Sequence, residues 1–259
     1  MGSSSNLRVP ILCYHQVVPE GKQNSLWTLG CEEFDRQLCR LSESGYQTIS
    51  LQDLCQWQEG RASLPSKPLI LTFDDGQEGF FDWVMPVLRK YRLDATLFLI
   101  AGELGKEVFF GGEDPPFRVM SGEEAAALAQ AGLDIQTHGL HHPDWTQIGP
   151  AELEQELRES ARILEGISGR PVKFFAYPYG CWNREVRDLA ESLGFTGGCT
   201  TMPGENAMDQ DRFLLKRTLV LNRQGGSWFP WMVYRSRYFG SRMIRKFWGN
   251  RQNEPRLFK

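Results

Sequence analysis

The sequence predicts an α/β fold, in which a largely parallel sheet carries helices on its outside. Short runs of apolar and β-branched residues alternate along the chain with segments whose apolar residues recur at helical spacing. Several of these runs end in carboxylates or histidines, and α/β folds present functional groups at the carboxyl ends of their strands. With 259 residues and 41% hydrophobic content, the chain is long enough for one barrel or two small domains.

The first half of the chain begins the alternation of strands and helices. Phe34, Leu38 and Leu41 fall at i, i+4 and i+7, which predicts a helix that Gly45 ends. The predicted strands of this half cover residues 9–14, 46–50, 69–73 and 95–100, and the predicted helices cover 31–44, 51–58 and 80–91.

Two features interrupt the regular pattern in the middle of the chain. In the helix over 80–91, Phe81, Val84 and Leu88 form the predicted inward face, and Pro86 predicts a kink. Residues 101–120 are rich in glycine and proline, which predicts a loop over the functional site.

The second half continues the same alternation. Ser121 and Glu124 form a capping box that predicts a helix start, and Gly132 predicts its end. A stripe of Leu153, Leu157 and Leu164 predicts an amphipathic helix. The remaining predicted helices and strands cover residues 121–131, 152–165 and 183–193, and 133–138, 172–176, 195–200 and 213–220.

Two adjacent carboxylates follow the strand predicted over 69–73. Asp74 and Asp75 enter a turn with Gly76, so a buried strand delivers both groups to one place. Neighbouring carboxylates repel and lose hydration in a cleft, so a cation or a shared proton has to compensate them. A solvated Asp-Asp-Gly turn is the alternative interpretation.

Three of the four histidines of the chain fall within five positions, after another predicted strand. His138 and His142 have H-x3-H spacing, and Gly139 and Pro143 indicate that a loop carries them. Two imidazoles and one carboxylate are a common ligand set for catalytic zinc, in which open positions remain for water and substrate. Histidines that only hydrogen-bond within the structure are the alternative.

These motifs resemble those of a known family, the NodB-type polysaccharide deacetylases, the fourth family of carbohydrate esterases. The resemblance rests on Thr72-Phe-Asp-Asp-Gly76, His138-x-x-x-His142-Pro143 and Phe175-Ala-Tyr-Pro-Tyr-Gly180, and covers about residues 10–220. It implies a distorted (β/α)7-type barrel, one divalent metal, usually zinc, and hydrolysis of the N-acetyl group of an amino sugar. It also implies site roles by position: Asp74 as general base, Asp75, His138 and His142 as metal ligands, and the backbone N–H of Tyr179 at the oxyanion.

The chain departs from the usual family pattern at two catalytic positions. No histidine follows His142, but His15 ends a Tyr-His pair that resembles a circularly permuted subgroup, so His15 is the candidate general acid. Ala176 stands where many members carry an arginine, and Arg217 is the candidate partner for Asp74. A hydrogen-bonded strand-end histidine and a surface arginine are the respective alternatives.

Two aromatic residues are candidates for the sugar site. Trp145 and Tyr177 could offer ring faces to a pyranose, and simple packing is the alternative.

Composition sets further limits. A net charge of −3 gives no electrostatic reason to expect nucleic-acid binding. The sequence contains no run of 18 apolar residues, so no membrane span is expected. No signal peptide is visible, so we expect a cytoplasmic protein whose six cysteines form no structural disulfide.

Three segments are expected. Residues 1–8 form a disordered N-terminus or a remnant of cloning, and residues 9–225 form the barrel. Residues 226–259 form a basic, aromatic tail that suits peripheral contact of residues 227–259 with the inner face of a membrane. A closing helix on the barrel is the alternative.

The predicted function is a metal-dependent deacetylase acting on amino sugars of a polysaccharide or a lipid-linked glycan. Two alternatives stay open: the same site acting on a formylated sugar or a small non-sugar amide, and a catalytically silent carbohydrate-binding module. Such a module would be expected to lack ligands or base, and here Asp74, Asp75, His138 and His142 are all present. Oligomeric state does not follow from the sequence.

Overall fold

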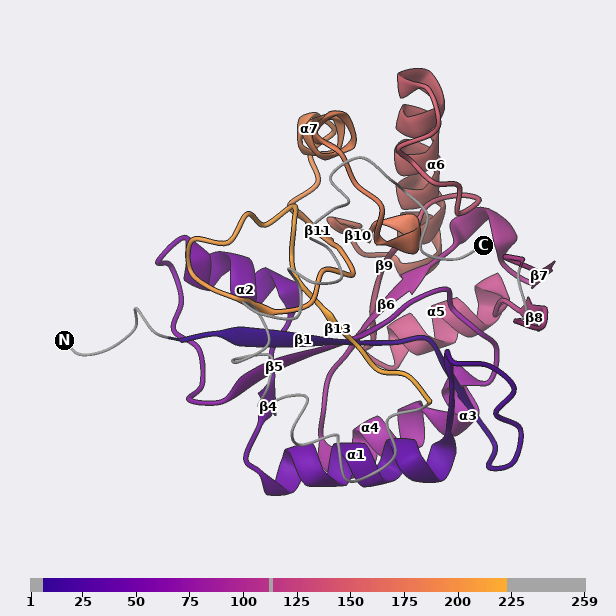
Figure 1. Ribbon diagram of the computed structural model, residues 1–259, viewed down its shortest axis with the longest axis vertical. Coiled ribbons are helices and arrows are strands. Elements are labelled where there is room, and N and C mark those ends of the chain that lie inside the picture. Colours follow the sequence, from indigo (N-terminus) through magenta and orange to yellow (C-terminus); the bar gives the residue numbers. More distant parts are fainter. Residues whose placement is uncertain (1–6, 112–113, 223–259) are drawn as a thin grey trace, which may run out of the picture.

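A curled, mainly parallel sheet of nine strands forms the centre of the computed structural model, which describes residues 7–111 and 114–222 (Figure 1). Seven strands follow one another in the order β11, β10, β9, β6, β5, β1 and β12; β4 pairs with β5, and β13 pairs with β1. The strands of this sheet are β1 (Val9–Tyr14), β4 (Gln47–Thr48), β5 (Pro68–Phe73), β6 (Thr96–Leu99), β9 (Asp134–Thr137), β10 (Phe174–Ala176), β11 (Gly197–Cys199), β12 (Glu205–Asn206) and β13 (Thr218–Leu219). Only the β1–β12 pair is antiparallel.

One irregular segment, residues 215–219, joins the two ends of the parallel sheet. Leu215 pairs with Cys199 beside β11, and Thr218 and Leu219 pair with Leu12 and Cys13 of β1. Six parallel strands and this segment therefore make a distorted barrel-like sheet, which confirms the predicted fold class. The circular permutation stays a prediction.

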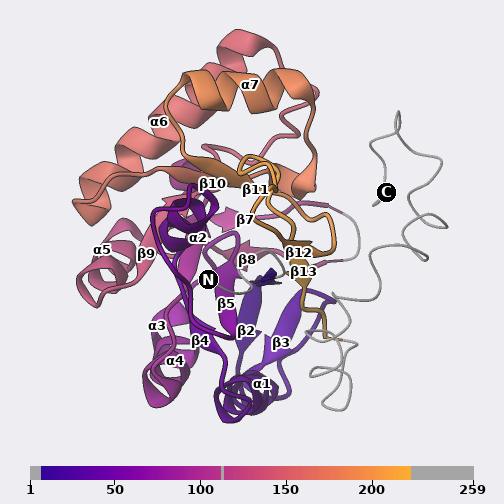
Figure 2. The same cartoon turned by 90° about the vertical axis from the view of Figure 1, so that its left-hand side faces the viewer.

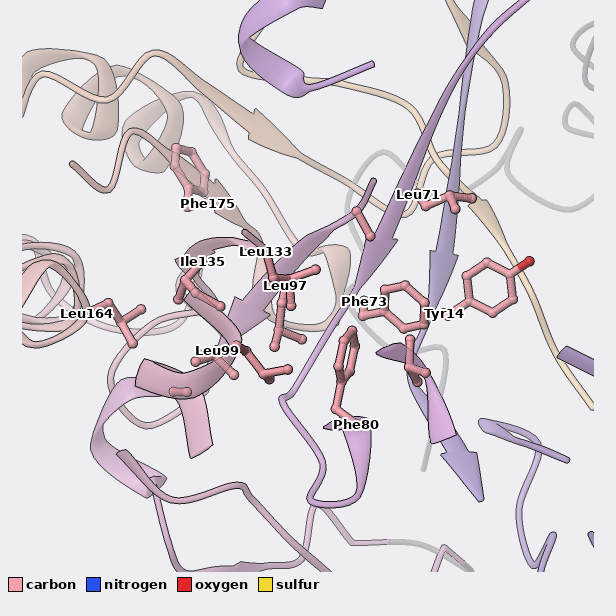
Figure 3. Packing of buried hydrophobic residues seen from close by; sticks show 14 of the residues in the cluster. Tyr14, Leu71, Phe73, Phe80, Leu97, Leu99, Leu133, Ile135, Leu164 and Phe175 are labelled. Atoms are coloured by element: carbon pink, nitrogen blue, oxygen red, sulfur yellow. The ribbon is translucent and has the colours of Figure 1, made fainter. Parts of the chain in front are cut away.

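Alternate residues along each strand enter two different apolar clusters. Leu12, Leu71 and Leu97 belong to a large cluster that also contains residues of the surrounding helices, whereas Ile11 and Ile70 belong to a smaller one. Since side chains alternate across a strand, the smaller cluster marks the concave side of the sheet and the larger one its helix-covered side. Figure 3 shows the larger cluster, in which the ring of Phe73 lies between those of Tyr14 and Phe80.

Helices cover the outside of this sheet. In Figure 2, α6 and α7 lie on one side of the strands and α1, α3 and α4 on the other. The helices are α1 (Cys31–Glu43), α2 (Leu51–Gln58), α3 (Phe80–Trp83), α4 (Met85–Tyr91), α5 (Gly122–Gln130), α6 (Pro150–Ser168) and α7 (Arg184–Ser192), with short 3-10 turns η2 (Ala101–Glu103) and η3 (Pro178–Gly180). The apolar face of α2 instead joins the smaller cluster through residues such as Leu51 and Leu54, so α2 closes the concave side.

The helix predicted over 80–91 is two helices. The break comes at Val84, and Pro86 then stands in the first turn of α4, where its missing N–H costs no hydrogen bond. On α3, Phe80 is buried in the core and Phe81 is 44% exposed, so the prediction of an inward Phe81 is wrong.

The structure differs from the sequence prediction at three further places. The loop predicted over 101–120 contains η2 and a small antiparallel hairpin of β7 (Glu107–Val108) and β8 (Phe117–Arg118). The strand predicted over 213–220 shortens to β13. Three further short strands were not predicted: β2 (Gln16–Val18) and β3 (Thr28–Gly30), which pair in parallel, and β12, which pairs with β1.

Two predicted segments lie wholly or mostly outside the described residues. Most of residues 1–8 and the whole tail 226–259 fall there, so the membrane contact expected of residues 227–259 stays a prediction. Within residues 7–111 and 114–222, no helix combines the length and the apolar character needed to cross a membrane.

Candidate metal centre and active site

The functional side chains lie at the carboxyl ends of β1, β5 and β9, three parallel strands of which β1 and β5 are paired and β9 is separated from β5 by β6. Asp74 continues the alternation of Ile70 and Thr72 in β5 and therefore faces the concave side of the sheet. His138 follows β9 and His15 follows β1, each one residue beyond its strand. Because adjacent parallel strands end at the same edge, these groups meet without any long connection.

Asp75, His138 and His142 bring three ligand atoms together, as the sequence predicted. His138 Nε2 lies 3.2 Å from His142 Nε2 and 3.5 Å from Asp75 Oδ1, and His142 Nε2 lies 3.8 Å from Asp75 Oδ1. A tetrahedral zinc site with bonds of about 2.0–2.1 Å has edges of about 3.3 Å between ligand atoms. The three atoms therefore fit a single divalent ion of that size.

The chemistry of this donor set also fits a cation. The backbone oxygen of Ala176 lies 2.9 Å from His138 Nδ1; if Nδ1 carries the proton, Nε2 is left with a free lone pair. Burial lowers the pKa of His138, which favours the neutral ring that a metal requires. Burial and the neighbouring Asp74 raise the pKa of Asp75 to about 8, so this carboxylate lacks a compensating charge.

Strained backbone supports two of the three ligands. Asp75 and His142 have φ values of 68° and 61°, in the left-handed region that residues with a Cβ rarely adopt. Gly76, at φ 79°, completes the turn after Asp75, and a Cβ there would stand 2.2 Å from Leu99 Cδ2. The glycine of the Asp-Asp-Gly motif is therefore required by close packing.

A buried glutamate shapes the histidine loop. Glu156 of α6 accepts hydrogen bonds from the backbone N–H groups of Leu140 at 2.8 Å and His141 at 3.1 Å. The sequence analysis missed this residue. A signal existed, because Glu156 falls three residues after Leu153 and so lies on the apolar face of the amphipathic helix.

Asp74 is held by a buried, two-pronged ion pair with Arg217. Both guanidinium nitrogens Nη1 and Nη2 donate to the carboxylate at 2.7 Å, and Arg217 Nε donates to the Thr200 backbone oxygen. Burial alone would raise the pKa of Asp74, but Arg217 and His138 outweigh burial and hold it well below its usual range. The predicted pairing is thus present, and its catalytic role stays a prediction.

His15 lies next to Asp74. It follows β1, which pairs with β5 on the edge away from β6 and β9. One ring nitrogen of His15, an Asp74 carboxylate oxygen and the Cys13 sulfur all lie within 4.8 Å of one another. Burial, aided by Arg217 and His138, lowers the pKa of His15 to about 4 against the opposing effect of Asp74. The structure thus brings the candidate acid beside the candidate base.

The group of Cys13, His15 and Asp74 is not a second metal site. Cys13 and His15 are neighbours of the Asp74 carboxylate. Arg217 already occupies both oxygens of Asp74, and the Cys13 thiol donates to Oδ2 at 3.4 Å.

The aromatic candidates divide into buried and exposed residues. Trp145 is 1% exposed and packs on Phe175 and Tyr177, and the Tyr177 hydroxyl donates to the Phe213 backbone oxygen. Neither Trp145 nor Tyr177 lines a sugar site, so packing is the correct alternative. Tyr179 is 53% exposed and its ring contacts His142, which places the η3 turn beside the candidate metal ligands.

A family model described as polysaccharide deacetylase matches residues 61–198, just over half of the chain. The chain belongs to the polysaccharide deacetylase family. The match contains Asp74, Asp75, His138, His142 and Tyr179 but not His15 or Arg217.

Individual relatives extend the similarity beyond that range. A putative polysaccharide deacetylase of Bacillus subtilis, YxkH, is 29% identical over 224 residues, 86% of this chain and 75% of the relative. The poly-β-1,6-N-acetyl-D-glucosamine N-deacetylase of Staphylococcus epidermidis is 22% identical over 222 residues, 82% of this chain and 75% of the relative.

Solved structures share the fold. The deacetylase PplD of Streptococcus pyogenes, in complex with acetate, superposes with a TM-score of 0.74 at 25% identity and covers 84% of this chain and 94% of its own. IcaB from Ammonifex degensii superposes with a TM-score of 0.71 at 23% identity, over 88% of this chain and 97% of its own. Family and fold together make the chain a hydrolase of the polysaccharide deacetylase type.

Proposed function

We propose that this deacetylase removes the N-acetyl group from amino sugars of a polysaccharide or lipid-linked glycan, with one divalent ion, zinc, held by Asp75, His138 and His142. The observation that carries the proposal is the grouping of these three ligands beside a carboxylate, Asp74, that does not take part in the ligand set. A metal site with a separate base is what hydrolysis of an unactivated amide requires.

The chain's own residues supply the proton transfers. A divalent ion would contribute Lewis acidity and lower the pKa of a bound water from 15.7 towards about 7. Asp74 then accepts the proton of the attacking water, and Arg217 keeps this carboxylate ionised and oriented. The backbone N–H of Tyr179 stabilises the oxyanion that forms at the carbonyl.

The amide nitrogen leaves only after it is protonated, and His15 serves as the acid. In the resting protein the pKa of His15 is about 4, so its ring is neutral near pH 7. The carboxylate of Asp74 favours the imidazolium, and the negative charge of the tetrahedral state favours it further. Because His15 lies beside Asp74, the proton that Asp74 accepts from the attacking water can pass to the imidazole and from there to the nitrogen, which leaves as the amine while the acetyl group leaves as acetate.

The alternatives are less well supported. A silent binding module has no use for a buried Arg217–Asp74 pair beside a ligand set, because burying charges costs free energy. A formylated sugar or a small non-sugar amide would use the same residues, and the substrate panel below separates these cases.

The test combines metal analysis with a substrate panel. Purified protein is expected to contain about one equivalent of zinc and to release acetate from N-acetylglucosamine oligomers, including β-1,6-linked ones. Parallel assays use a lipid-linked N-acetylated sugar, a formylated sugar and a simple acetamide. Release from the formylated sugar or the acetamide alone would replace the proposal with the corresponding alternative, and a metal-free, inactive protein would refute it.

A further inference from the structure

The two histidine ligands differ in what holds their rings. Nδ1 of His138 lies 2.9 Å from the backbone oxygen of Ala176, the kind of hydrogen bond that usually orients a metal-binding histidine. Nδ1 of His142 is buried and has no hydrogen-bond partner within the described part of the chain. No hydrogen bond at Nδ1 therefore orients His142 in the way that one orients His138, and the side chains packed on the ring are the contacts that can do so.

Two aromatic rings enclose His142. Phe110 stacks on the imidazole at a centroid distance of 4.4 Å and an interplanar angle of 22°. Tyr179 meets the imidazole at 4.5 Å and 65°, in an edge-on arrangement. Phe110 and Tyr179 also contact one another at 6.4 Å, so the three rings form one group.

Both enclosing rings are unusually exposed to solvent for aromatic side chains. Phe110 is 38% exposed and Tyr179 is 53% exposed, although exposed aromatic surface is costly in water. Tyr179 additionally has a φ of 57°, a strained value for a residue with a Cβ. Strain and exposure at the same spot favour a functional reason for their positions.

The segment that carries Phe110 is tied to the other end of the ligand set. Val119, directly after β8, forms a bridge with Gln77, and the backbone N–H of Met120 donates to the Gly76 oxygen at 2.9 Å. These contacts attach the β7–β8 hairpin to the turn that presents Asp75. The hairpin thus contacts both parts of the ligand set. Residues 119–120, directly after β8, hold the turn that follows Asp75, and Phe110 packs on His142.

We propose that Phe110 and Tyr179 form an aromatic clamp that positions His142 for the metal, in place of the hydrogen bond that His138 has. The clamp acts through packing: it restricts the imidazole to the orientation in which Nε2 faces Asp75 and His138. Phe110 and Tyr179 are positioning residues of the metal centre. This inference rests on the proposed metal dependence.

The test measures metal affinity without any substrate. Zinc binding is determined by competition with a chromogenic zinc chelator for the wild type, Phe110→Ala, Phe110→Tyr and Phe109→Ala. Loss of an orienting partner of a metal ligand typically weakens affinity by about 10- to 100-fold, and this range is expected for Phe110→Ala. Phe110→Tyr retains the ring and should keep wild-type affinity.

Phe109→Ala is the matched control. Phe109 is the neighbouring residue of the same type, is 61% exposed, and makes no ring contact within the described residues. Its removal should leave zinc affinity unchanged. Circular dichroism of each metal-free variant verifies the fold, and Tyr179→Ala against Tyr179→Phe repeats the comparison from the second ring.

The outcomes separate the two proposals. If the wild type binds zinc and Phe110→Ala binds it equally well, or if Phe109→Ala weakens it as much, the clamp is wrong and the metal centre stands. If the wild type binds no zinc, the proposed function fails first and the clamp with it.

Discussion

The surroundings shift the pKa values of two neighbouring carboxylates, Asp74 and Asp75, in opposite directions. Arg217 and His138 hold the pKa of Asp74 well below its usual range despite burial, whereas burial and Asp74 raise the pKa of Asp75 to about 8. A pair of titratable groups pushed apart in this way indicates a division of roles. Asp74 has its counter-charge within the protein, and Asp75 still needs one, which a cation can supply.

Asp74→Asn should abolish turnover and leave metal content unchanged. The amide is nearly isosteric but cannot accept the proton of water, and general base catalysis contributes about 10²–10⁴ in rate. Acetate release and metal analysis of the same preparation measure both effects. Asp75→Asn is the comparison, since it should lose metal as well; a fully active Asp74→Asn protein would remove the base assignment.

Removing Arg217 should cost both activity and stability. Arg217→Ala leaves Asp74 buried without a partner, and breaking such a pair typically costs about 3–5 kcal/mol of unfolding free energy. Urea unfolding measures the loss. Arg212→Ala is the control, because Arg212 pairs with Glu59 at the surface and its removal should change stability little. Equal unfolding midpoints for the two variants would contradict the prediction.

His15→Gln should slow turnover by about 10²–10⁴ without loss of metal, as expected for a general acid. It should also alter the pH dependence of stability in metal-free protein. The pKa of His15 is about 4 when folded against 6.5 for a free imidazole, so between these values the unfolded chain binds a proton that the folded chain excludes. Stability from this group is therefore lost as pH falls from 6.5 to 4.

The size of this pH effect can be measured by comparison. The shift corresponds to about 3 kcal/mol at most, and His15→Gln should lose correspondingly less stability than the wild type between pH 6.5 and 4. Asp74, Arg217 and His138 face His15 in both proteins, so their own titration largely cancels in the difference. Parallel stability curves for the two proteins would show that His15 is not held neutral.

At the scale of elements, the loop after β9 depends on one glycine. Gly139 has a φ of 88°, and a Cβ there would stand 2.9 Å from Glu156 Oε2 and 3.1 Å from Trp145 Cζ2. Those two groups hold the loop between His138 and His142, so they cannot move away without displacing it.

Gly139→Ala should therefore weaken zinc binding as well as destabilise the fold. Gly132→Ala is a matched control, because Gly132 has a φ of 101° and nothing within 4 Å of the added Cβ. Both variants share the strain of a left-handed alanine, about 1–3 kcal/mol, and only Gly139→Ala adds the clash. Chelator competition and urea unfolding separate the effects; weakened zinc binding by both variants would assign the effect to strain alone.

The same elements show which features a sequence can predict. The ligand-bearing turns were predictable because apolar strand, polar pair and glycine are contiguous in the chain, as in 69–76. The contacts of Glu156 and Phe110 were not, because each reaches the histidine loop from a segment distant in sequence. Tyr177 was ambiguous for another reason. Alternation of side chains along and just beyond β10 places it on the helix-covered side of the sheet, and this follows only once the register of β10 is known.

At the scale of the whole molecule, the two ends of the described chain complete the site. β1 contains Cys13 and is followed directly by His15, and the closing segment 215–219 supplies Arg217. Arg217 was named from the sequence because Ala176 stands where the resemblance implies an arginine and Asp74 needs a counter-charge, but the strand that follows Arg217 was predicted too long and is only the two residues of β13. Closure of the sheet, and not local pattern, fixes where the guanidinium lies.

Because the ligands come from separate strand ends, metal binding should stabilise the whole fold. A ligand that binds only the folded state adds RT ln(1 + [L]/Kd), about 2.7 kcal/mol at 100 times Kd. Thermal unfolding with zinc and with a chelator should therefore give a higher Tm with zinc. Asp75→Asn should abolish this increment, because a ligand is missing.

Leu54→Ala provides the contrast. Leu54 lies on α2, fully buried in the cluster on the concave side, and its truncation should cost about 2–5 kcal/mol. Since Leu54 is not a ligand, zinc should still raise the Tm of this variant by a similar free energy. A zinc increment that survives in Asp75→Asn, or that disappears in Leu54→Ala, would show that the metal acts elsewhere than at the strand ends.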